Sequence, residues 1–185
     1  GVAEACAQAG PMVGEVIRAS VNDGLVVSTT LDPKEQAFLN DHRGDRVTAL
    51  LPAVMGIEGM VETTRLLAPY WSLAAVENVD FLAPLKFYRD EPRTLTIRAL
   101  LHPDGDDLLA ECRVEAERDL PGSDAPTRTT HFTGRVRLTR SEPAAEHADP
   151  PVREGAEVTA DDVYAAYFHG PAYQGVREIS PLGSN

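Results

Sequence analysis

The run of residues that begins after Pro52 restricts the fold of this chain more than any other part of the sequence. Residues 53–68 are apolar at helical spacing, and proline suits the first turn of a helix. The side chains that share one face are Val54, Ile57, Val61 and Ala68, with Met60 and Leu67 beside them. A helix this apolar is expected to be buried over more than half of its circumference. Gly56 and Gly59 each weaken a helix by about 0.8–1 kcal/mol relative to alanine, so we expect close packing contacts there.

Strand-like segments flank this helix in the sequence. Before it, β-branched residues on both sides of Asn22-Asp23-Gly24 predict a hairpin over residues 12–32, because these turn residues tolerate positive φ. The strands expected after the helix cover residues 74–81, 94–101, 108–117 and 129–139, with a turn at 103–106. The last of them alternates apolar and polar residues, which is typical of a half-buried strand. One apolar helix followed by strands predicts an α+β fold in which an antiparallel sheet wraps around the helix.

The other segments predict the domain organisation. Residues 1–11 are expected to be a linker or the tail of a preceding domain, and residues 33–46 a polar loop with a helical turn near 35–39. Residues 141–157 are rich in proline, alanine and glutamate and predict a linker. Thr159, with Asp162 three residues later, predicts a helix that ends near Tyr167. A strand is expected to begin at 176–179.

The composition excludes several classes of protein. The 185 residues carry a formal net charge of −12, and an acidic chain is repelled by nucleic-acid phosphates. No run approaches the roughly 20 apolar residues of a membrane span. Cys6 and Cys112 stand in no metal-binding spacing and imply no disulfide framework, so we expect a cytoplasmic protein without a metal. Because the chain begins at Gly1 without a secretory signal, we expect it to be part of a longer protein.

Two short segments carry groups suited to chemistry. His42 follows Asp41 in a polar loop before the apolar helix, where its ordinary pKa near 6.5 suits a general base. Residues 167–174 combine a tight His169-Gly170-Pro171 turn with aromatic side chains that can line a pocket. Taken separately, the first also fits a surface histidine that caps a backbone group, and the second a turn with core aromatics.

Together these segments resemble the polyketide synthase dehydratase family. Residues 38–42 (Phe-Leu-Asn-Asp-His) and 50–58 (Leu-Leu-Pro-Ala-Val-Met-Gly-Ile-Glu) resemble its first motif, and residues 79–87 the strand that follows its helix. Residues 167–175 resemble the Tyr-Gly-Pro-x-Phe-Gln-Gly motif that opens its second half, with His169 where tyrosine is commoner. The likeness is greatest to the enediyne-type and polyunsaturated fatty-acid synthase dehydratases and covers nearly all of residues 12–180.

The resemblance implies a double hot-dog protein, with the first hot dog over residues 12–140 and an incomplete second one over 158–185. It implies dehydration of a β-hydroxyacyl group carried on the phosphopantetheine of an acyl carrier protein, without a cofactor of its own. It implies His42 as the catalytic base, and as substrate-binding residues Pro52, Gly56, His169, Gly170, Pro171 and Tyr173. It further implies other synthase domains as partners. Because a hot dog leaves the edges of its sheet open, and open edges invite pairing, we also expect a homodimer. A docking patch for an acidic carrier would need local basic residues, for which the candidates are Arg135, Arg137 and Arg140.

Two departures from the family leave alternatives open. Pro52 follows His42 one residue later than in the family motif, and the family's catalytic aspartate would lie beyond Asn185. The chain alone is therefore expected to be inactive. A non-catalytic hot dog with a structural or acyl-docking role is the main alternative. A free-standing hot-dog thioesterase is the third, although a single hot dog would need neither the linker nor the second motif.

The remaining polar residues are interpreted as structural. Glu58 on the apolar helix is expected to support a loop backbone or to pair with an arginine such as Arg46. His131 is expected on the polar face of its strand, and His102 and His147 are expected to be solvated.

Overall fold

A computed structural model describes residues 9–118, 126–141, 158–176 and 179 of the chain. The strands are β1 (Glu15–Ser20), β2 (Gly24–Leu31), β3 (Ala49–Leu50), β4 (Ser72–Phe81), β5 (Lys86–Phe87), β6 (Arg93–Asp104), β7 (Asp107–Arg118) and β8 (Thr127–Thr139). The helices are α2 (Ala37–Asn40), α3 (Ala53–Leu67) and α4 (Ala160–Ala166), with 3₁₀ turns η1 (Tyr88–Asp90) and η2 (Pro171–Tyr173). Residues 1–8 and 142–157, which make up most of the two expected linkers, lie outside the described residues, as do His147 and residues 177–178 of the strand expected at 176–179. Residues 9–11 are described, and Ala9 packs against the core.

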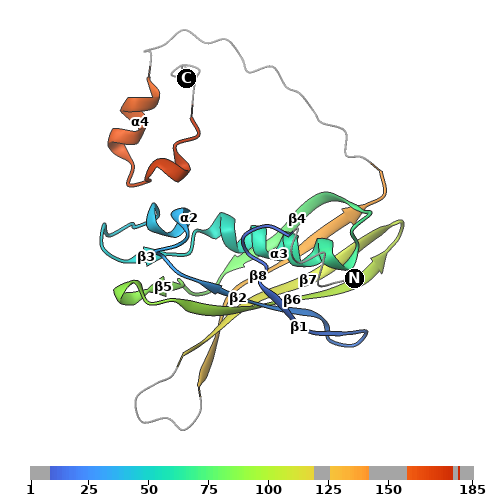
Figure 1. Cartoon of the computed structure of the whole chain (residues 1–185). Helices are drawn as coiled ribbons and strands as arrows, with labels where there is room; N and C mark the ends of the chain where they lie inside the picture. The colour runs from blue at the N-terminus through green and yellow to red at the C-terminus, as the bar shows by residue number, and fades with distance from the viewer. Residues whose placement is uncertain (1–8, 119–125, 142–157, 177–178, 180–185) are drawn as a thin grey trace.

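Six strands form one antiparallel sheet in the order β1-β2-β6-β7-β8-β4, and β3 pairs with β5 in a separate two-stranded sheet. Helix α3 lies across one face of the large sheet and contacts β2, β4, β6, β7 and β8 (Figure 1). This is the predicted α+β hot-dog arrangement of an antiparallel sheet around a central helix, and it is confirmed.

The predicted hairpin turns are also confirmed. β1 pairs with β2 through the turn that ends at Gly24, which has a φ of +71°. A Cβ on Gly24 would lie 2.1 Å from the carbonyl oxygen of Ala99, so only glycine fits there. The turn between β6 and β7 is tighter than predicted, because the ladder continues to the pair Asp104–Asp107 around Gly105, at a φ of +64°.

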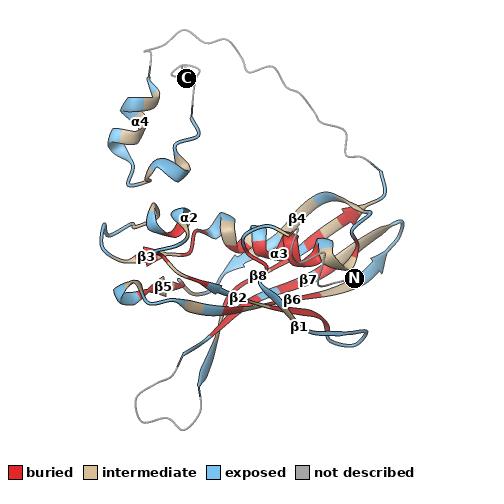
Figure 2. Cartoon of the chain, viewed as in Figure 1, coloured by how far each residue is buried: buried red, intermediate tan, exposed pale blue. Residues whose placement is uncertain are grey.

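The buried face of α3 differs from the predicted one. A Cβ on Gly59 would lie 2.7 Å from Cδ1 of Ile97, and one on Gly56 3.1 Å from the ring of Phe132, so the close contacts expected at both glycines are present. The face that meets the sheet carries these glycines and the fully buried Met60, Thr63 and Thr64 (Figure 2). Of the face predicted from the sequence, Val61 and Ala68 are buried, whereas Val54 is 60% exposed. The glycines allow the helix to approach the sheet closely, and this contact fixes its rotation.

The buried acid of α3 is Glu62 rather than Glu58. Glu58 is exposed, and within the described residues its side chain forms no hydrogen bond with a loop backbone and no ion pair with Arg46, the contacts that had been expected of it. Glu62 is 7% exposed because residues 10–12 pass over it, and its Oε2 accepts a hydrogen bond from the backbone N–H of Met12 at 2.9 Å. Its Oε1 has no partner among the described residues. Burial raises the pKa of Glu62 to about 7.

His131 is buried, although it was expected on the polar face of its strand. Only 3% of the residue is exposed, and its Nδ1 lies 3.0 Å from the carbonyl oxygen of Ala83. Because a carbonyl can only accept, Nδ1 carries the proton and ties β8 to the segment after β4. His102 is exposed, as predicted.

The raised pKa of Glu62 predicts that stability falls as the pH rises. Glu62 releases its proton near pH 4.5 in the unfolded chain and near pH 7 in the folded chain. The protonated form therefore stabilises the fold fully below pH 4.5, and this contribution to the free energy of unfolding is lost as the pH rises through 7. The loss is about 3 kcal/mol at 1.36 kcal/mol per pKa unit. In urea unfolding at pH 5 and pH 8, Glu62→Gln should remove most of this dependence, and Glu15→Gln, at an exposed position, should not. Equal pH dependence in wild type and Glu62→Gln would contradict the assignment.

Candidate functional site

The site is built around the loop that carries His42. Helix α2 ends at Asn40, and the backbone N–H of His42 donates to the carbonyl of Leu39 at 3.2 Å. The backbone N–H of Leu50, in β3, donates to the carbonyl of His42 at 3.1 Å. The Nδ1 of His42 lies 3.0 Å from the carbonyl oxygen of Leu50, so Nδ1 carries the proton. In the neutral ring, Nε2 therefore keeps its lone pair and can accept a proton.

The second predicted segment packs against this loop through Asp41. The backbone N–H of Gly170 donates to the carbonyl oxygen of Asp41 at 2.9 Å, and that of Ala172 to its Oδ2 at 2.8 Å. A Cβ on Gly170 would lie 2.5 Å from Cγ of Asp41, which explains the glycine. The hydroxyl of Tyr173 donates to the carbonyl of Phe38 at 2.8 Å. The structure therefore brings the two motifs together, and Figure 1 shows the segment after α4 facing α2.

Aromatic rings surround the imidazole of His42. The centroids of Phe168, His169 and Tyr173 lie 5.2, 5.6 and 5.8 Å from that of His42. The ring of His169 stacks on Phe168, with centroids 4.3 Å apart. These contacts limit access of water to His42 and place a second imidazole beside it.

The imidazole lies at a cleft between α3 and the C-terminal segment. The cleft has a volume of about 420 Å³, and its lining residues are His42, Pro52, Ala53, Val54, Val163, Tyr164, Tyr167, His169, Tyr173 and Val176. Most of the wall is apolar or aromatic. The arrangement suits an apolar chain whose reacting carbon lies near the imidazole.

The electrostatics of the cleft favour a neutral His42. Burial lowers its pKa, and a charge on His169 lowers it further, whereas the hydrogen bond to Leu50 raises it. Burial and the nearby Asp41 raise the pKa of Tyr173 to about 12, so its hydroxyl remains a donor. At neutral pH the cleft therefore holds an unprotonated Nε2, as a general base requires.

The predicted site residues fall into two groups. His42, Pro52, His169 and Tyr173 line the cleft together. Gly56 does not line it and packs on Phe132 instead. Gly170 and Pro171 shape the turn that presents His169, and Gly170 lines a neighbouring cavity of about 310 Å³ with Asp41, Arg43 and Arg46.

Sequence reasoning missed two features of the cleft. Val54 was placed on the apolar helix face with Val61 and Ala68, but it lines the cleft, because the contacts at Gly56 and Gly59 rotate the first turn of α3 away from the sheet. Asp41 was named only as the neighbour of His42. Its bond to Ala172 spans 131 residues, and no local pattern in the sequence indicates such a contact.

The candidate basic patch consists largely of paired side chains. Arg137 contacts Glu77, Asp104 and Asp107, and hydrogen bonds to the first two raise its pKa. Arg135 lies 3.8 Å from Glu111, and Arg140 lies over the ring of Trp71. Arg135 and Arg137 therefore contribute little unbalanced positive charge.

Within the described part of the chain, no three histidine, cysteine or acidic side chains converge as metal ligands would. Burial raises the pKa of the Cys112 thiol to about 11, so this cysteine remains a neutral thiol in the core. Among the described helices, none combines the length and the apolar character of a membrane span.

Comparison with known proteins gives one family. The polyketide synthase dehydratase domain family matches residues 10–115. The fold is similar to the dehydratase domain from the CurF module of curacin polyketide synthase, with a TM-score of 0.71 and 18% identity over 92% of this chain and 62% of that one. It is also similar to the dehydratase domain of PpsC from Mycobacterium tuberculosis, with a TM-score of 0.60 and 24% identity over 90% and 57%.

A third similar structure comes from work on dehydratase substrate selection in the borrelidin and fluvirucin polyketide synthases. Its TM-score is 0.63 and its identity 22%, over 91% of this chain and 57% of that one. The chain thus spans less than two thirds of the length of these solved structures. At 18–24% sequence identity, the similarity establishes the fold alone. No curated protein matches the sequence.

The contact between Gly170 and Asp41 predicts the effect of a single methyl group. Gly170→Ala should displace the Asp41 side chain and break its bond to the N–H of Ala172, because the new Cβ would lie 2.5 Å from Cγ of Asp41. Hydrogen exchange at the amides of Gly170 and Ala172 should then accelerate. Gly175→Ala is the matched control, since nothing lies within 4 Å of its Cβ position. Unchanged protection in Gly170→Ala would show that the segment is not held by Asp41.

Proposed function

Because the chain belongs to the polyketide synthase dehydratase domain family, we propose that it forms the first part of a dehydratase that acts on a β-hydroxyacyl group carried by an acyl carrier protein. The observation that carries this proposal is the geometry of His42. Its Nδ1 is engaged by the carbonyl of Leu50, and the ring lies at a largely apolar cleft that the second motif completes.

The proposed base is Nε2 of His42. It takes the α-proton of the thioester, and the electron pair of that C–H bond forms the Cα–Cβ double bond while the Cβ–O bond breaks. The backbone N–H groups of Ala53 and Val54 lie at the start of α3, where a helix leaves N–H groups unpaired and carries positive partial charge. These groups would polarise the thioester carbonyl and thereby stabilise charge that develops on its oxygen.

The leaving hydroxyl needs a proton to depart as water. The family resemblance assigns this proton to an aspartate that would follow Asn185. The first hot dog would then supply the base, His42, and the second the acid. Because the 185-residue chain has only the base, it is proposed to be inactive alone. The proposed reaction uses no metal or redox cofactor, and the substrate is held on the phosphopantetheine of the carrier.

Substrate contacts are proposed at the walls of the cleft. Pro52 and Tyr173 would contact the pantetheine or acyl chain beside the reacting carbons, and His169 would face the β-hydroxyl. Val54 adds an apolar wall that suits the acyl chain. Gly56, Gly170 and Pro171 would act through the backbone that they shape.

The longer His42–Pro52 spacing is the feature that favours a non-catalytic alternative. Both residues nevertheless line the same cleft. The loop between them contains Arg46 at a φ of 62°, a backbone conformation uncommon for residues other than glycine. The positive φ of Arg46 lets the loop take up the extra residue while His42 and Pro52 remain at the same cleft. We therefore favour a catalytic dehydratase over a non-catalytic hot dog.

The proposed setting is a cytoplasmic synthase. Among the described strands, β1 and β4 form the edges of the large sheet, and open edges invite pairing. We propose that the second hot dog covers one of them and that the assembled protein is a homodimer that receives substrate from the carrier and other synthase domains.

In the complete protein, His42→Ala should abolish formation of the enoyl product from a β-hydroxyacyl pantetheine thioester. General-base catalysis contributes about 10²–10⁴-fold, so only a trace of turnover should remain. His102→Ala is the control, because this histidine is exposed on β6. The 185-residue chain assayed in parallel should form little or no product. Wild-type rates in His42→Ala would exclude this residue as the base.

A further inference from the structure

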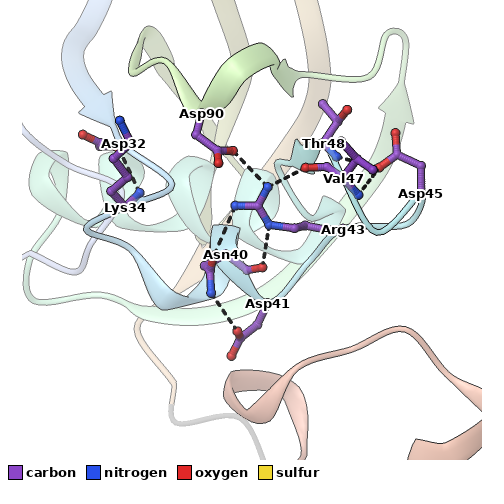
Figure 3. Close-up of polar contacts among 9 residues, drawn as sticks. All are labelled: Asp32, Lys34, Asn40, Asp41, Arg43, Asp45, Val47, Thr48 and Asp90. Carbon is purple, nitrogen blue, oxygen red and sulfur yellow. Dashed lines mark hydrogen bonds and ion pairs between the residues drawn. The ribbon is translucent and has the colours of Figure 1, made fainter.

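The side chain of Arg43, the residue after His42, fills the inside of the loop that carries the imidazole (Figure 3). Its Nε and Nη2 donate to the backbone carbonyl and the side-chain oxygen of Asn40, at 3.1 Å each. Its Nη1 donates to the carbonyl of Val47 at 2.6 Å. These bonds join the start of the loop to its end, and His42 lies in the stretch between them.

The same guanidinium ties the loop to a distant segment. Nη1 of Arg43 lies 2.9 Å from Oδ1 of Asp90, the last residue of η1. The side chains of this ion pair are 19% and 35% exposed, so the contact is only partly screened by water. A charged donor and acceptor at this distance form one of the stronger kinds of hydrogen bond.

A second connection reaches His42 from the same part of the chain. Leu50 pairs with Lys86, which is in β5 immediately before η1. The carbonyl of Leu50 also accepts the hydrogen bond from Nδ1 of His42. The imidazole is therefore anchored through Leu50 and β5, and its backbone through Arg43 and Asp90, to one continuous segment.

The backbone on both sides of the ion pair is strained. Arg46, Arg89 and Asp90 have φ angles of 62°, 58° and 54°. Such conformations cost about 1–3 kcal/mol each in residues other than glycine and persist where surrounding contacts impose them. The carboxylate of Asp45 adds further bonds, accepting from the N–H groups of Val47 and Thr48 at 2.9 and 2.6 Å. The loop is thus held in one defined conformation.

We propose that Arg43 and Asp90 form a clamp that positions His42 for proton transfer, with Arg43 ordering the loop and Asp90 anchoring Arg43. The clamp contributes no proton to the reaction and acts only through the orientation of the imidazole. The expected effect of the clamp on turnover rests on the proposed dehydratase function. Its effect on His42 itself is independent of any substrate.

The test compares four variants in the complete protein. Asp90→Asn removes the charge of the anchor, and Arg43→Lys removes the planar group that reaches Asn40 and Val47 together. Both should lower kcat about 10–100-fold with KM nearly unchanged, as misplacement of a catalytic group by about 1 Å does. Asp90→Glu should restore most of the lost rate. Glu117→Gln is the matched control, because it removes an exposed ion pair with Arg128 on β7 and β8.

A titration of His42 by NMR separates positioning from loss of structure. Loosening the loop exposes the ring, so the lowered pKa of His42 should rise toward its ordinary value in the two clamp variants and stay low in Glu117→Gln. The titratable groups that line the cleft with the ring are Tyr164, Tyr167, His169 and Tyr173, and Asp41 precedes His42 in the loop. None of these groups is changed in the variants. Thermal unfolding followed in parallel measures how much folded protein each variant retains.

The outcomes distinguish the clamp from the proposed function. If wild-type protein forms no enoyl product, the proposed function fails, and the titration of His42 still decides whether the clamp exists. If wild-type protein turns over and both clamp variants keep its kcat and its His42 titration, the clamp is refuted. Loss of activity that only follows loss of folded protein, with the His42 titration unchanged, refutes it as well.

Discussion

The close approach of α3 to the sheet is the contact on which the rest of the structure depends. Gly56 meets the ring of Phe132 and Gly59 meets Ile97, so that a Cβ would lie 3.1 Å from the ring at Gly56 and 2.7 Å from Cδ1 of Ile97 at Gly59, and either side chain would force its neighbour to move. Each glycine costs a helix about 0.8–1 kcal/mol, and burial of the helix face offsets that cost. Once these contacts fix the rotation of the helix, the face with Met60, Thr63 and Thr64 meets the sheet, and Val54 faces outward into the cleft. The first turn of α3 then lies beside the imidazole of His42.

Three side chains from one short loop convert this scaffold into a site. His42 supplies a nitrogen with a free lone pair because the carbonyl of Leu50 holds the proton on the other nitrogen. Asp41 holds the turn of the second motif, and Arg43 holds the loop itself through Asp90. Neighbouring residues thus provide the reacting group, the contact that closes the cleft over it, and the contact that keeps it in place.

Much of the fold follows from local patterns in the sequence. The apolar run after Pro52, the turn at Gly24 and the alternation in β8 identified the helix, the hairpin and a half-buried strand, because each pattern has a direct physical cause. The capping box at Thr159 was also predictable, and both of its hydrogen bonds are present. The pairing of the two motifs came from a family resemblance, since no local rule joins residues near 42 to residues near 170.

What the sequence did not indicate depends on contacts between distant segments. The choice of Glu62 over Glu58 as the buried acid is made by residues 10–12, which pass over one turn of the helix and not the other. The burial of His131 depends on the carbonyl of Ala83, 48 residues away. The apolar face of α3 was predicted only in part. Val61, Ala68 and Met60 are buried as expected, whereas the contacts at Gly56 and Gly59 rotate the helix so that Val54 is exposed.

The central claim is that His42 presents a free Nε2 to the cleft because its Nδ1–H is held by Leu50. The tautomer of this imidazole can be measured directly from the long-range ¹H–¹⁵N NMR spectrum of the complete protein at neutral pH, with His42→Ala used to assign the signal. We expect a neutral ring protonated at Nδ1. A ring protonated at Nε2, or at both nitrogens, would contradict it, because no lone pair would then face the substrate.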